Sequence, residues 1–598
     1  MNDAVMKKSL NCDFCVIGGG LSGSFAALSA ARHGAKVVLV QDRPMLGGNA
    51  SSEIRMWVRG ARGLYNRETG LISELEERNI HGNPTLVHSL FDATLYGMLA
   101  ENENITLLLN TSCFDAKMEG NKIISVTGWQ MTTYTRITIE AKLFADCSGD
   151  SILADLTGAE YRHGREAREE FGEHLAQDKD DSRTMGMSII LAARETDHPV
   201  KFILPSFANC YPDDSCFDPE LEKSVHALPR DHIVGTSKTN LWWVELGGEL
   251  HSIYDAEKMR DELLASIYGV WDHIKNHGDH GMENWDLEWV GFLPGKRESR
   301  RYIGDYILTE KDLLSGGDFY DEIAYGGWPI DDHNPYGMRK NAESNIASLS
   351  VELDGPYGIP LRSLYSRNIE NLYFAGRNIS VSHVALSSTR VMATCALLGQ
   401  AAGIAAAISI EKDLLPRDTA ERFYGEIQKL LLDDGVFLPH HAREINELTK
   451  SAKLNITCVE REVLFNGIER PRSEGDENGI WQNIGDELCF AFDEKKRIGT
   501  LRLRFDPDFS RMSVSDNKKM RVFAMKLHTG KDFAPVRVAS SIVKSFAVYA
   551  DGKEVWRTDS NFLSLVKVPL NIEAKEIRVK WFATNGAEGV HLFSADFI

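Results

Sequence analysis

The sequence is poor in positive charge and in cysteine. Its 598 residues carry 67 Lys and Arg against 87 Asp and Glu, a formal net charge of −20. Because nucleic acids and anionic membrane surfaces are bound through clustered Lys and Arg, this balance argues against both as partners. The nine cysteines lack the repeated short spacing that an iron–sulfur cluster requires. Cys210 and Cys216 could pair, although a reduced, cytoplasmic chain needs no disulfides.

The sequence also shows no leader, and its one long apolar run is unusual for a membrane span. Residues 1–10 contain no apolar core of a signal peptide, so a cytoplasmic location is expected. The longest uncharged apolar stretch, 391–410, is long enough to cross a bilayer. It is rich in Ala and Gly and contains Thr394 and Gln400. This composition favours a buried helix packed near a cofactor.

What the N-terminal part does contain is a glycine-rich turn between two apolar runs, 14–17 and 37–40, with an Ala-rich helical segment in between. Gly18 allows a tight strand-to-helix turn, Gly20 lets a pyrophosphate approach the backbone, and Gly23 lets the helix pack closely on the strand. The N-terminus of the helix then presents N–H groups to the phosphates. We therefore predict a dinucleotide site; the alternative is a glycine-rich turn in an unrelated α/β domain.

The residues after the second apolar run favour FAD over NAD. The position of the usual ribose-binding acid is occupied by Gln41, and Asp42 and Arg43 follow it. The Gln41 amide can still bind a ribose hydroxyl. A second glycine pair, Gly47-Gly48, comes next. The longer FAD continues past the first phosphate site and needs such an element, whereas an NAD site does not.

Two further apolar runs end in glycine turns that would face the same cofactor. These turns are Ser148-Gly149-Asp150 and Gly376-Arg377-Asn378. The Ala-rich helix follows the last of them, so its N-terminal end would point at a negative group, for which the pyrimidine end of a flavin is the candidate.

The length is too great for one core, so several domains are expected. We predict an α/β fold: a Rossmann-like FAD-binding domain with an inserted α+β substrate domain and a C-terminal all-β sandwich of jelly-roll type. The proposed division is FAD-binding domain 1–160 and 355–412, substrate domain 161–354, helical connector 413–454 and β domain 455–598. The period-two alternation after 455 and the Asp551-Gly552 hairpin signal favour the last of these.

Within these domains we expect a small antiparallel meander of strands at 105–110, 123–129 and 136–140. The insert should contain strands at 185–192 and 239–246 and a long helix at 256–277. It is also rich in tryptophan, at Trp242, Trp243, Trp271, Trp285, Trp289 and Trp328. Cys12-x-x-Cys15 lies on the first strand, where side chains alternate between faces, and is interpreted as packing.

Four motifs together resemble a family of bacterial FAD-dependent oxidoreductases in the glutathione-reductase-like flavoprotein class. They lie at Leu46–Glu53, Arg297–Arg301, Tyr325–Pro329 and Ala375–Ala385. The resemblance covers about residues 12–412 and implies FAD as the cofactor. Many members of the class carry Asp where this chain has Arg377 or Asn378.

The resemblance also implies roles for individual residues. The first three glycines bind the FAD diphosphate, Gln41 stands in for the ribose-binding acid, and Cys113 occupies the place of a backbone contact to adenine. The full predicted cofactor set is Gly18, Gly20, Leu21, Ser22, Gly23, Gln41, Asp42, Arg43, Gly47, Gly48, Asn49, Ala50, Ser52, Cys113, Ser148, Gly149, Asp150, Gly376, Arg377 and Asn378.

Candidate catalytic residues follow from what flavin chemistry requires of the protein. His383 lies in the segment expected beside the flavin ring, and the ordinary pKa of histidine suits a general base; the alternative is a structural histidine. Arg297 and Arg301 would share one face of a helix and could clamp a carboxylate. The alternative for this pair is an ion pair with Glu298 or Asp305. Tyr325 is the fourth catalytic candidate.

A substrate site is expected around Trp328, Asp331 and His333, with the indole stacking on a sugar ring; a packed aromatic loop explains the same residues equally well. No metal site is predicted, because adjacent residues such as Asp331, Asp332 and His333 have poor geometry for one ion.

These observations predict an FAD-dependent oxidoreductase that moves a hydride between a polar small molecule and the flavin N5, with an electron acceptor that the sequence does not identify. A carbohydrate or sugar acid is the expected substrate. One alternative is a fumarate-reductase-like reductase of unsaturated acids. Another is a carbohydrate-binding protein with a structural flavin, in which the β domain binds sugar. The β domain could equally serve dimerisation, which would make the protein a homo-oligomer.

Overall fold

The computed structural model describes residues 5–598 except 64, 214–243, 278–279, 339–347, 456–460, 474, 510–522, 524 and 526–534. Predictions for Cys216, Trp242, Trp243 and most of the strand expected at 239–246 therefore lie outside the described residues.

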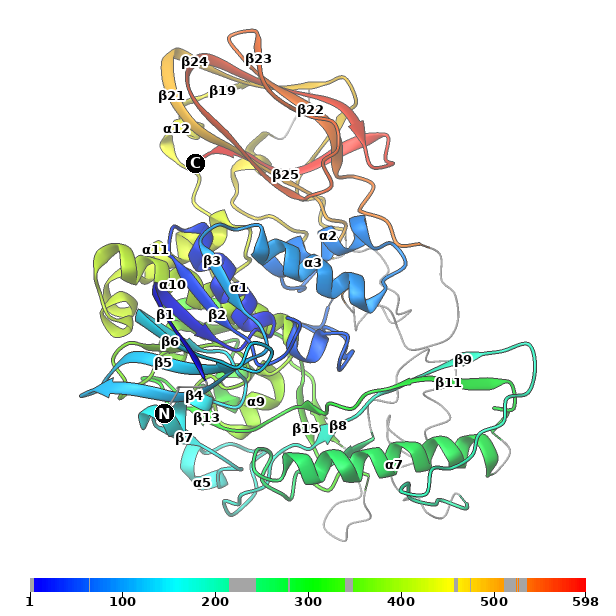
Figure 1. Cartoon of the computed structure of the whole chain (residues 1–598). Coiled ribbons are helices and arrows are strands. Elements are labelled where there is room, and N and C mark those ends of the chain that lie inside the picture. Colours follow the sequence, from blue (N-terminus) through cyan, green and yellow to red (C-terminus); the bar gives the residue numbers. More distant parts are fainter. Residues whose placement is uncertain are drawn as a thin grey trace.

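A seven-stranded sheet forms the centre of the N-terminal domain (Figure 1). Its strand order is β3-β2-β1-β6-β5-β4, with β18 also paired to β6. Strands β1, β2, β3, β6 and β18 are parallel, and β5 and β4 are antiparallel. The bounds are β1 (Met6–Ile17), β2 (Val37–Val40), β3 (Ile105–Leu108), β4 (Thr111–Glu119), β5 (Lys122–Gln130), β6 (Thr135–Asp146) and β18 (Leu372–Phe374). This confirms the predicted Rossmann-like sheet, which β18 completes after the insert.

The predicted meander was wrong by one strand. Residues 105–108 form β3, which pairs parallel with β2 at the edge of the main sheet. Asn110 has a φ of 53°, and the chain turns there into β4. The meander is therefore β4-β5-β6. Alternating apolar residues occur in both kinds of strand, so the pattern did not distinguish a parallel edge strand from a meander strand.

Helices α1 (Leu21–Arg32) and α10 (Met392–Lys412) pack against each other beside this sheet (Figure 1). Small residues allow the close approach: a Cβ on Gly399 would lie 2.0 Å from the carbonyl oxygen of Ser22. By length and composition α10 could cross a membrane, but 94% of its apolar window is buried inside the protein. The expectation of a buried helix is thus confirmed.

The insert contains a long helix and several short antiparallel strand pairs. Helix α7 (Ala256–Asn276) matches the predicted 256–277, and its Trp271 is fully buried in a local apolar core. The strands of the insert are β7 (Tyr161–Arg162), β8 (Met187–Ser188), β9 (Leu191–Glu195), β10 (Glu245–Leu246), β11 (Trp285–Val290), β12 (Gly295–Lys296), β13 (Arg301–Tyr302), β14 (Glu322–Gly326), β15 (Ile330–His333) and β16 (Ser348–Val351). Strand β17 (Tyr357–Pro360) follows the insert and pairs with β14. The strand expected at 185–192 is divided between β8 and β9.

The remaining helices surround these sheets. They are α2 (Leu71–Gly82), α3 (His88–Ala100), α4 (Ile152–Thr157), α5 (Arg168–Phe171), α8 (Glu310–Leu314), α9 (His383–Thr389), α11 (Pro416–Asp433) and α12 (Glu447–Ser451). The described cysteines are free, and Cys15 is fully buried, in agreement with a packing role.

The C-terminal domain is an antiparallel sheet, as expected. Its strands are β19 (Lys453–Asn455), β20 (Ile480–Asn483), β21 (Glu487–Phe505), β22 (Val543–Ala550), β23 (Lys553–Thr558), β24 (Leu565–Thr584) and β25 (Gly589–Phe597). They pair in the order β20-β25-β21-β24-β22-β23, with β19 on β21. Asp551 and Gly552 have φ of 46° and 82° and join β22 to β23, the hairpin that the sequence predicted.

The described strands of this domain hydrogen-bond into one sheet with its own apolar core, rather than into two separate sheets. Bulges interrupt the pairing of the long strands β21 and β24, and Figure 1 shows these strands strongly curved. The domain also packs on the FAD-binding part of the chain. Arg470 donates hydrogen bonds to the carbonyl oxygens of Tyr65 and Arg67 at 2.7 and 3.1 Å.

Candidate active site

A cavity of about 810 Å³ extends from the glycine turns into the insert. Its volume is typical of small-molecule and cofactor sites, which occupy about 300–1,000 Å³. Walls come from all three predicted turns, from the 56–62 segment, from 293–297 and from β15 and the start of α10. These segments are far apart in sequence, so the fold itself assembles the site at the carboxyl ends of the parallel strands.

The first glycine turn has the geometry of a phosphate site. Gly18 has a φ of 99°, and a Cβ there would lie 2.5 Å from the backbone of Cys147. A Cβ on Gly23 would lie 1.7 Å from the Gly18 carbonyl oxygen, so only glycine permits this packing. Among the described residues, no side chain caps the start of α1. Gly20, Leu21 and Ser22 line the cavity there, where N–H groups and the helix dipole suit a diphosphate.

Gln41 connects two loops at one end of the cavity. Its Oε1 accepts a hydrogen bond from the Gly19 amide at 2.6 Å, and its Nε2 donates to the Met45 carbonyl oxygen at 3.2 Å. Asp42, Arg43 and Cys113 line the same end. The Gln41 amide is thus already used to shape the loop, and any contact with a ribose would be additional to these two bonds.

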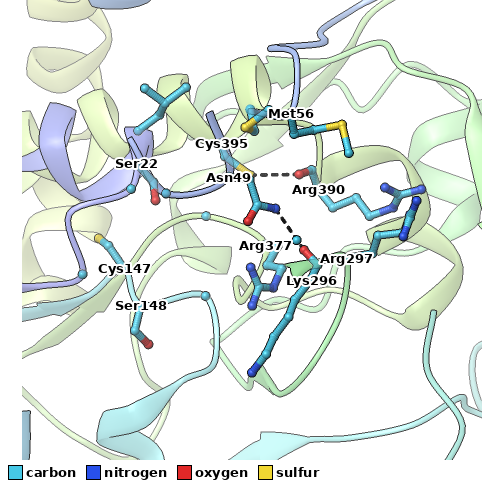
Figure 2. A pocket seen from close by; sticks show the side chains of 18 of the residues that line it. Ser22, Asn49, Met56, Cys147, Ser148, Lys296, Arg297, Arg377, Arg390 and Cys395 are labelled. Carbon is cyan, nitrogen blue, oxygen red and sulfur yellow. Dashed lines mark hydrogen bonds between the residues drawn. The ribbon is translucent and has the colours of Figure 1, made fainter. Parts of the chain in front are cut away.

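The second and third turns meet at an ion pair in the middle of the cavity. Lys296 Nζ and Arg377 Nη2 each lie 2.6 Å from one oxygen of Asp150. Burial alone would raise the pKa of Asp150, but the two cations outweigh it and hold the pKa at about 2. Figure 2 shows Arg377 and Lys296 near each other, between Ser148 and Arg297. Asn49 Nδ2 donates to the Lys296 carbonyl oxygen at 3.1 Å. Gly47, Gly48, Ser148, Gly149 and Gly376 also line this region.

Four of the predicted cofactor residues do not line the cavity but lie behind its lining residues. Gly23 and Ala50 are buried. Ser52 donates its amide to Asp92 and its hydroxyl to the sulfur of Met45. Asn378 Nδ2 donates to the Asp146 carbonyl oxygen at 3.2 Å. These residues position the turns and are not among those that line the cavity.

The predicted substrate residues Trp328, Asp331 and His333 all line the other end of the cavity. His333 Nδ1 lies 2.8 Å from Glu245 Oε2, and Nε2 lies 3.3 Å from Asp331 Oδ2. Burial alone would lower the pKa of His333, but Glu245 and Asp331 raise it above its ordinary value. Asp332 points the opposite way, toward His383, as alternation along β15 requires.

Of the four predicted catalytic residues, only Arg297 lines the cavity. It donates to Ser188 Oγ at 2.9 Å and pairs with Glu245 at 3.1 Å. Arg301 instead pairs with Glu298 and Glu166. Glu298 is one of the two alternative ion-pair partners that the sequence offered. The two arginines are not on one helix, because residues 297–300 are irregular and Arg301 begins β13. The predicted carboxylate clamp of this pair is therefore wrong.

Tyr325 and His383 are also placed away from the cavity wall. The Tyr325 hydroxyl donates to the carbonyl oxygens of Asn66 and Arg67. His383 Nδ1 lies 3.0 Å from Glu298 Oε1, and Nε2 lies 3.1 Å from Asp332 Oδ1. Burial alone would lower the pKa of His383, but these carboxylates raise it to about 10. Carboxylates thus engage both ring nitrogens, and His383 is not among the residues that line the cavity, which favours the alternative of a structural histidine.

Sequence reasoning missed most of the cationic lining. Within the described part of the chain, seven cations line the cavity against three carboxylates: Arg43, Arg59, Arg62, Lys296, Arg297, Arg377 and Arg390 against Asp42, Asp150 and Asp331. The only available signal was proximity to motifs, since Arg59 follows the LGGNASSE motif, Lys296 precedes Arg297, and Arg390 follows the helix of His383.

The lining fits FAD on structural grounds. The uncapped start of α1 and the glycine pair suit the diphosphate, and Arg43, whose Nη1 lies 3.7 Å from Glu53 Oε2, adds a cation at the Gln41 end. The Gly20, Gly48, Gly149 and Gly376 backbones would cradle the cofactor, which supplies hydride-acceptor chemistry when bound.

Comparison with known proteins agrees with this geometry. The family model described as FAD dependent oxidoreductase matches residues 13–431. Glycerol-3-phosphate dehydrogenase of Mycobacterium leprae (strain TN) is 45% identical over 69 residues, which are 11% of this chain and only 12% of that protein's length.

Two solved structures are similar at low identity. A geranylgeranyl bacteriochlorophyll reductase-like protein from Thermoplasma acidophilum is 13% identical, with 71% of this chain and 83% of that chain covered and a TM-score of 0.31. Glycerol-3-phosphate dehydrogenase from Bacillus halodurans, complexed with FAD, is 16% identical, with 33% and 43% covered and a TM-score of 0.19. Neither likeness bears on the substrate. On the family match, which spans most of the chain, this protein belongs to the FAD dependent oxidoreductase family and is an FAD-dependent enzyme.

Proposed function

We propose that the enzyme oxidises a hydroxyl-bearing carbon of a carbohydrate or sugar acid and passes the hydride to FAD. The observation that carries the proposal is the continuity of the cavity, which joins the three glycine turns to Trp328, Asp331 and His333. An indole beside a carboxylate and an imidazole suits a polyhydroxylated ligand, because the ring covers an apolar sugar face while the polar groups bind hydroxyls.

Asp331 is the best-placed group to accept the hydroxyl proton. Of the three carboxylates in the described cavity wall, Asp42 lies at the Gln41 end. Asp150 is in two ion pairs of 2.6 Å with Lys296 and Arg377, whereas the contacts of Asp331 with His333 and Arg390 are longer, at 3.3 and 3.4 Å. Asp331 lies at the Trp328 end and receives hydrogen bonds from the Trp328 indole at 3.4 Å and from Arg390. These donors orient the carboxylate and leave it further acceptor capacity.

His333 and Arg297 position this carboxylate. Glu245 and Asp331 raise the pKa of His333, which favours its protonated form, and its Nε2 lies 3.3 Å from Asp331 Oδ2. Arg297 fixes Glu245, which in turn orients the His333 ring. The proposed proton acceptor is therefore Asp331 Oδ, whose orientation His333 and Arg390 fix.

The proposal is tested by anaerobic mixing of the holoenzyme with sugars, polyols and sugar acids while the flavin absorbance is followed. We expect one class to bleach the flavin. Asp331→Asn should retain FAD and slow the reduction roughly 100-fold or more, the range of a lost general base. Asp286→Asn, at an ion pair with Arg194 outside the cavity, is the matched control. A flavin that no such compound bleaches contradicts the proposal.

A second candidate is reduction of an unsaturated acid in the same cavity. The specific observation in its favour is His333, a buried imidazole with a raised pKa in the cavity wall, since such a reduction needs a proton donor. Reoxidation of dithionite-reduced enzyme by fumarate or crotonate, without bleaching by any polyol, would favour this direction.

A further inference from the structure

We infer that the substrate carries an anionic oxygen group, a carboxylate or a phosphate ester, that is bound by Arg59 and Arg390. The inference rests on the proposed function and deepens it by selecting sugar acids or sugar phosphates over neutral sugars. It depends on two arginines that the sequence motifs did not identify and that belong to different parts of the chain.

Arg59 is a cavity-lining cation on which the charges of Arg62 and, with the opposite effect, Asp331 act. Its guanidinium lies over the rings of Trp57 and Trp328, at 5.0 and 6.0 Å from their centroids. Its Nη1 is buried and has no hydrogen-bond partner in the described part of the chain. Burial and the neighbouring Arg62 charge lower the pKa of Arg59 to about 10, which still leaves it charged at neutral pH. An anion in the cavity would relieve both the unmade bond and the repulsion.

Arg390 approaches from the end of α9, and its side chain is only 11% exposed. Its Nη2 donates to the Asp331 backbone carbonyl at 2.9 Å, and its Nε is buried with no partner among the residues described. Figure 2 shows the guanidinium groups of Arg390 and Arg297 together on one side of the cavity, opposite Ser22, Cys147 and Ser148. The cationic end of the cavity is thus distinct from the end that faces the start of α1.

Charge balance supports a second anion besides the FAD diphosphate. The protein carries a net charge of −20, yet cations outnumber carboxylates seven to three in the described lining of this cavity. Most of these cations have a carboxylate partner: Lys296 and Arg377 pair with Asp150, Arg297 with Glu245, Arg62 with Glu352, Arg43 with Glu53 and Arg390 with Asp331. Among the described residues this leaves Arg59 as the lining cation without an ion pair. Arg59 and Arg390 lie beside Trp328 and Asp331, where the proposed reaction places the substrate.

The test compares matched ligands on the oxidised holoenzyme by isothermal titration calorimetry. Gluconate, glucose 6-phosphate and glucose share a carbon skeleton and differ in charge. We expect gluconate or glucose 6-phosphate to bind roughly 10-fold or more tightly than glucose, as charge-assisted hydrogen bonds require. Tighter binding of gluconate would identify the anionic group as a carboxylate, and tighter binding of glucose 6-phosphate would identify it as a phosphate ester. Equal binding of all three ligands would overturn the inference.

Arginine variants locate the site. Arg59→Gln and Arg390→Gln should each weaken binding of the charged ligand roughly 10-fold or more, and Arg59→Lys should lose less because it keeps the charge. Arg55→Gln is the matched control: Arg55 lies four positions away, stacks 4.0 Å from the Trp289 ring centroid and is outside the cavity lining. We expect its affinity to be unchanged.

Two further measurements separate the possible failures. If Arg59 serves the flavin instead of a substrate, Arg59→Gln will lower the flavin reduction potential and leave gluconate and glucose 6-phosphate binding unchanged, which overturns the inference. If the charged ligand binds through Arg59 and Arg390 but bleaches no flavin, the anion site stands while the proposed oxidation fails. The two claims are therefore decided by different readouts.

Discussion

The Phe523 backbone amide donates a hydrogen bond to the Val58 carbonyl oxygen at 3.3 Å. Val58 lies between Trp57 and Arg59, which both line the cavity. Its own amide donates to the sulfur of Met525 at 3.4 Å. Both the carbonyl and the amide of Val58 are thus hydrogen-bonded to the C-terminal part of the chain, which fixes the cavity segment in place. This argues that the β domain supports the active site, whether or not it also binds a ligand of its own.

Phe523→Ala tests this support. The ring is 5% exposed and lies 4.0 Å from the Arg67 guanidinium, so truncation should lower the free energy of unfolding by about 3–5 kcal/mol. We also expect slower flavin reduction by substrate, because the Trp57–Arg59 segment loses its anchor. Urea unfolding and stopped-flow absorbance measure the two effects. Phe114→Ala, at a 41% exposed ring in β4, should cost less than about 1 kcal/mol. Equal decreases in the free energy of unfolding and in the rate of flavin reduction for the two variants would contradict the anchoring role of Phe523.

Gly18→Ala should abolish FAD retention. The position combines a φ of 99° with backbone atoms of Cys147 that would lie only 2.5 Å from the added Cβ. The turn must therefore open, which displaces the phosphate-facing start of α1. Gly34 has a similar φ of 95°, but an added Cβ there would meet no described atom within 4 Å. Gly34→Ala should cost about 1 kcal/mol and keep the flavin. Flavin absorbance per protein after gel filtration distinguishes the two; a yellow Gly18→Ala protein would refute the assignment.

The fold and cofactor site were largely predictable because their signals are local. Gly18, Gly20 and Gly23 lie within six residues, and a Cβ at Gly18 or Gly23 would collide with backbone atoms, while Gly20 leaves the backbone open to a phosphate. The long buried helices and the hairpin at Asp551 likewise follow from short-range patterns.

The substrate end was less predictable because its partners are distant in sequence. Arg59, Asp331 and Arg390 meet only after the insert folds back, and nothing near Arg59 in the chain distinguishes it from Arg55, which lies outside the cavity. His383 illustrates the converse problem. Its sequence context suggested a base of ordinary pKa, but two carboxylates from other segments convert it into a buried imidazolium.

His383→Gln should therefore destabilise the protein in a pH-dependent way. Loss of the cation leaves the half-buried Asp332 without this partner and leaves Glu298 paired with Arg301 alone, at a cost of up to about 3 kcal/mol. The folded-state pKa is raised from 6.5 to about 10. The stabilisation is accordingly complete below pH 6.5 and is lost as the pH rises through 10.

Thermal unfolding of both proteins from about pH 6 to about pH 10 measures this effect. The difference in Tm between wild type and His383→Gln should be greatest at the acid end and shrink toward the alkaline end. His198→Gln, at a largely exposed histidine beside Asp197, should show no such trend. A Tm difference that does not change with pH would mean that His383 is neutral in the folded protein.

Trp328 links the proposed proton acceptor to the proposed anion site. Its indole Nε1 donates to Asp331 Oδ2 at 3.4 Å, and its ring faces Arg62 and Arg59 at 5.1 and 6.0 Å. Trp328→Phe keeps a ring for the arginines but removes the donor, whereas Trp328→Ala removes both. We expect Trp328→Phe to slow flavin reduction by the substrate, with little change in the affinity for the charged ligand.

Trp328→Ala should in addition weaken binding of that ligand roughly 3- to 10-fold, the value of two cation–π contacts. The two variants should differ because the indole N–H donates a hydrogen bond to Asp331, whereas the ring face makes the cation–π contacts with Arg59 and Arg62. Stopped-flow reduction and calorimetry on the same preparations separate the two effects. If Trp328→Phe weakens binding as much as Trp328→Ala does, the ring face is not what positions Arg59, and Trp57 alone must do so.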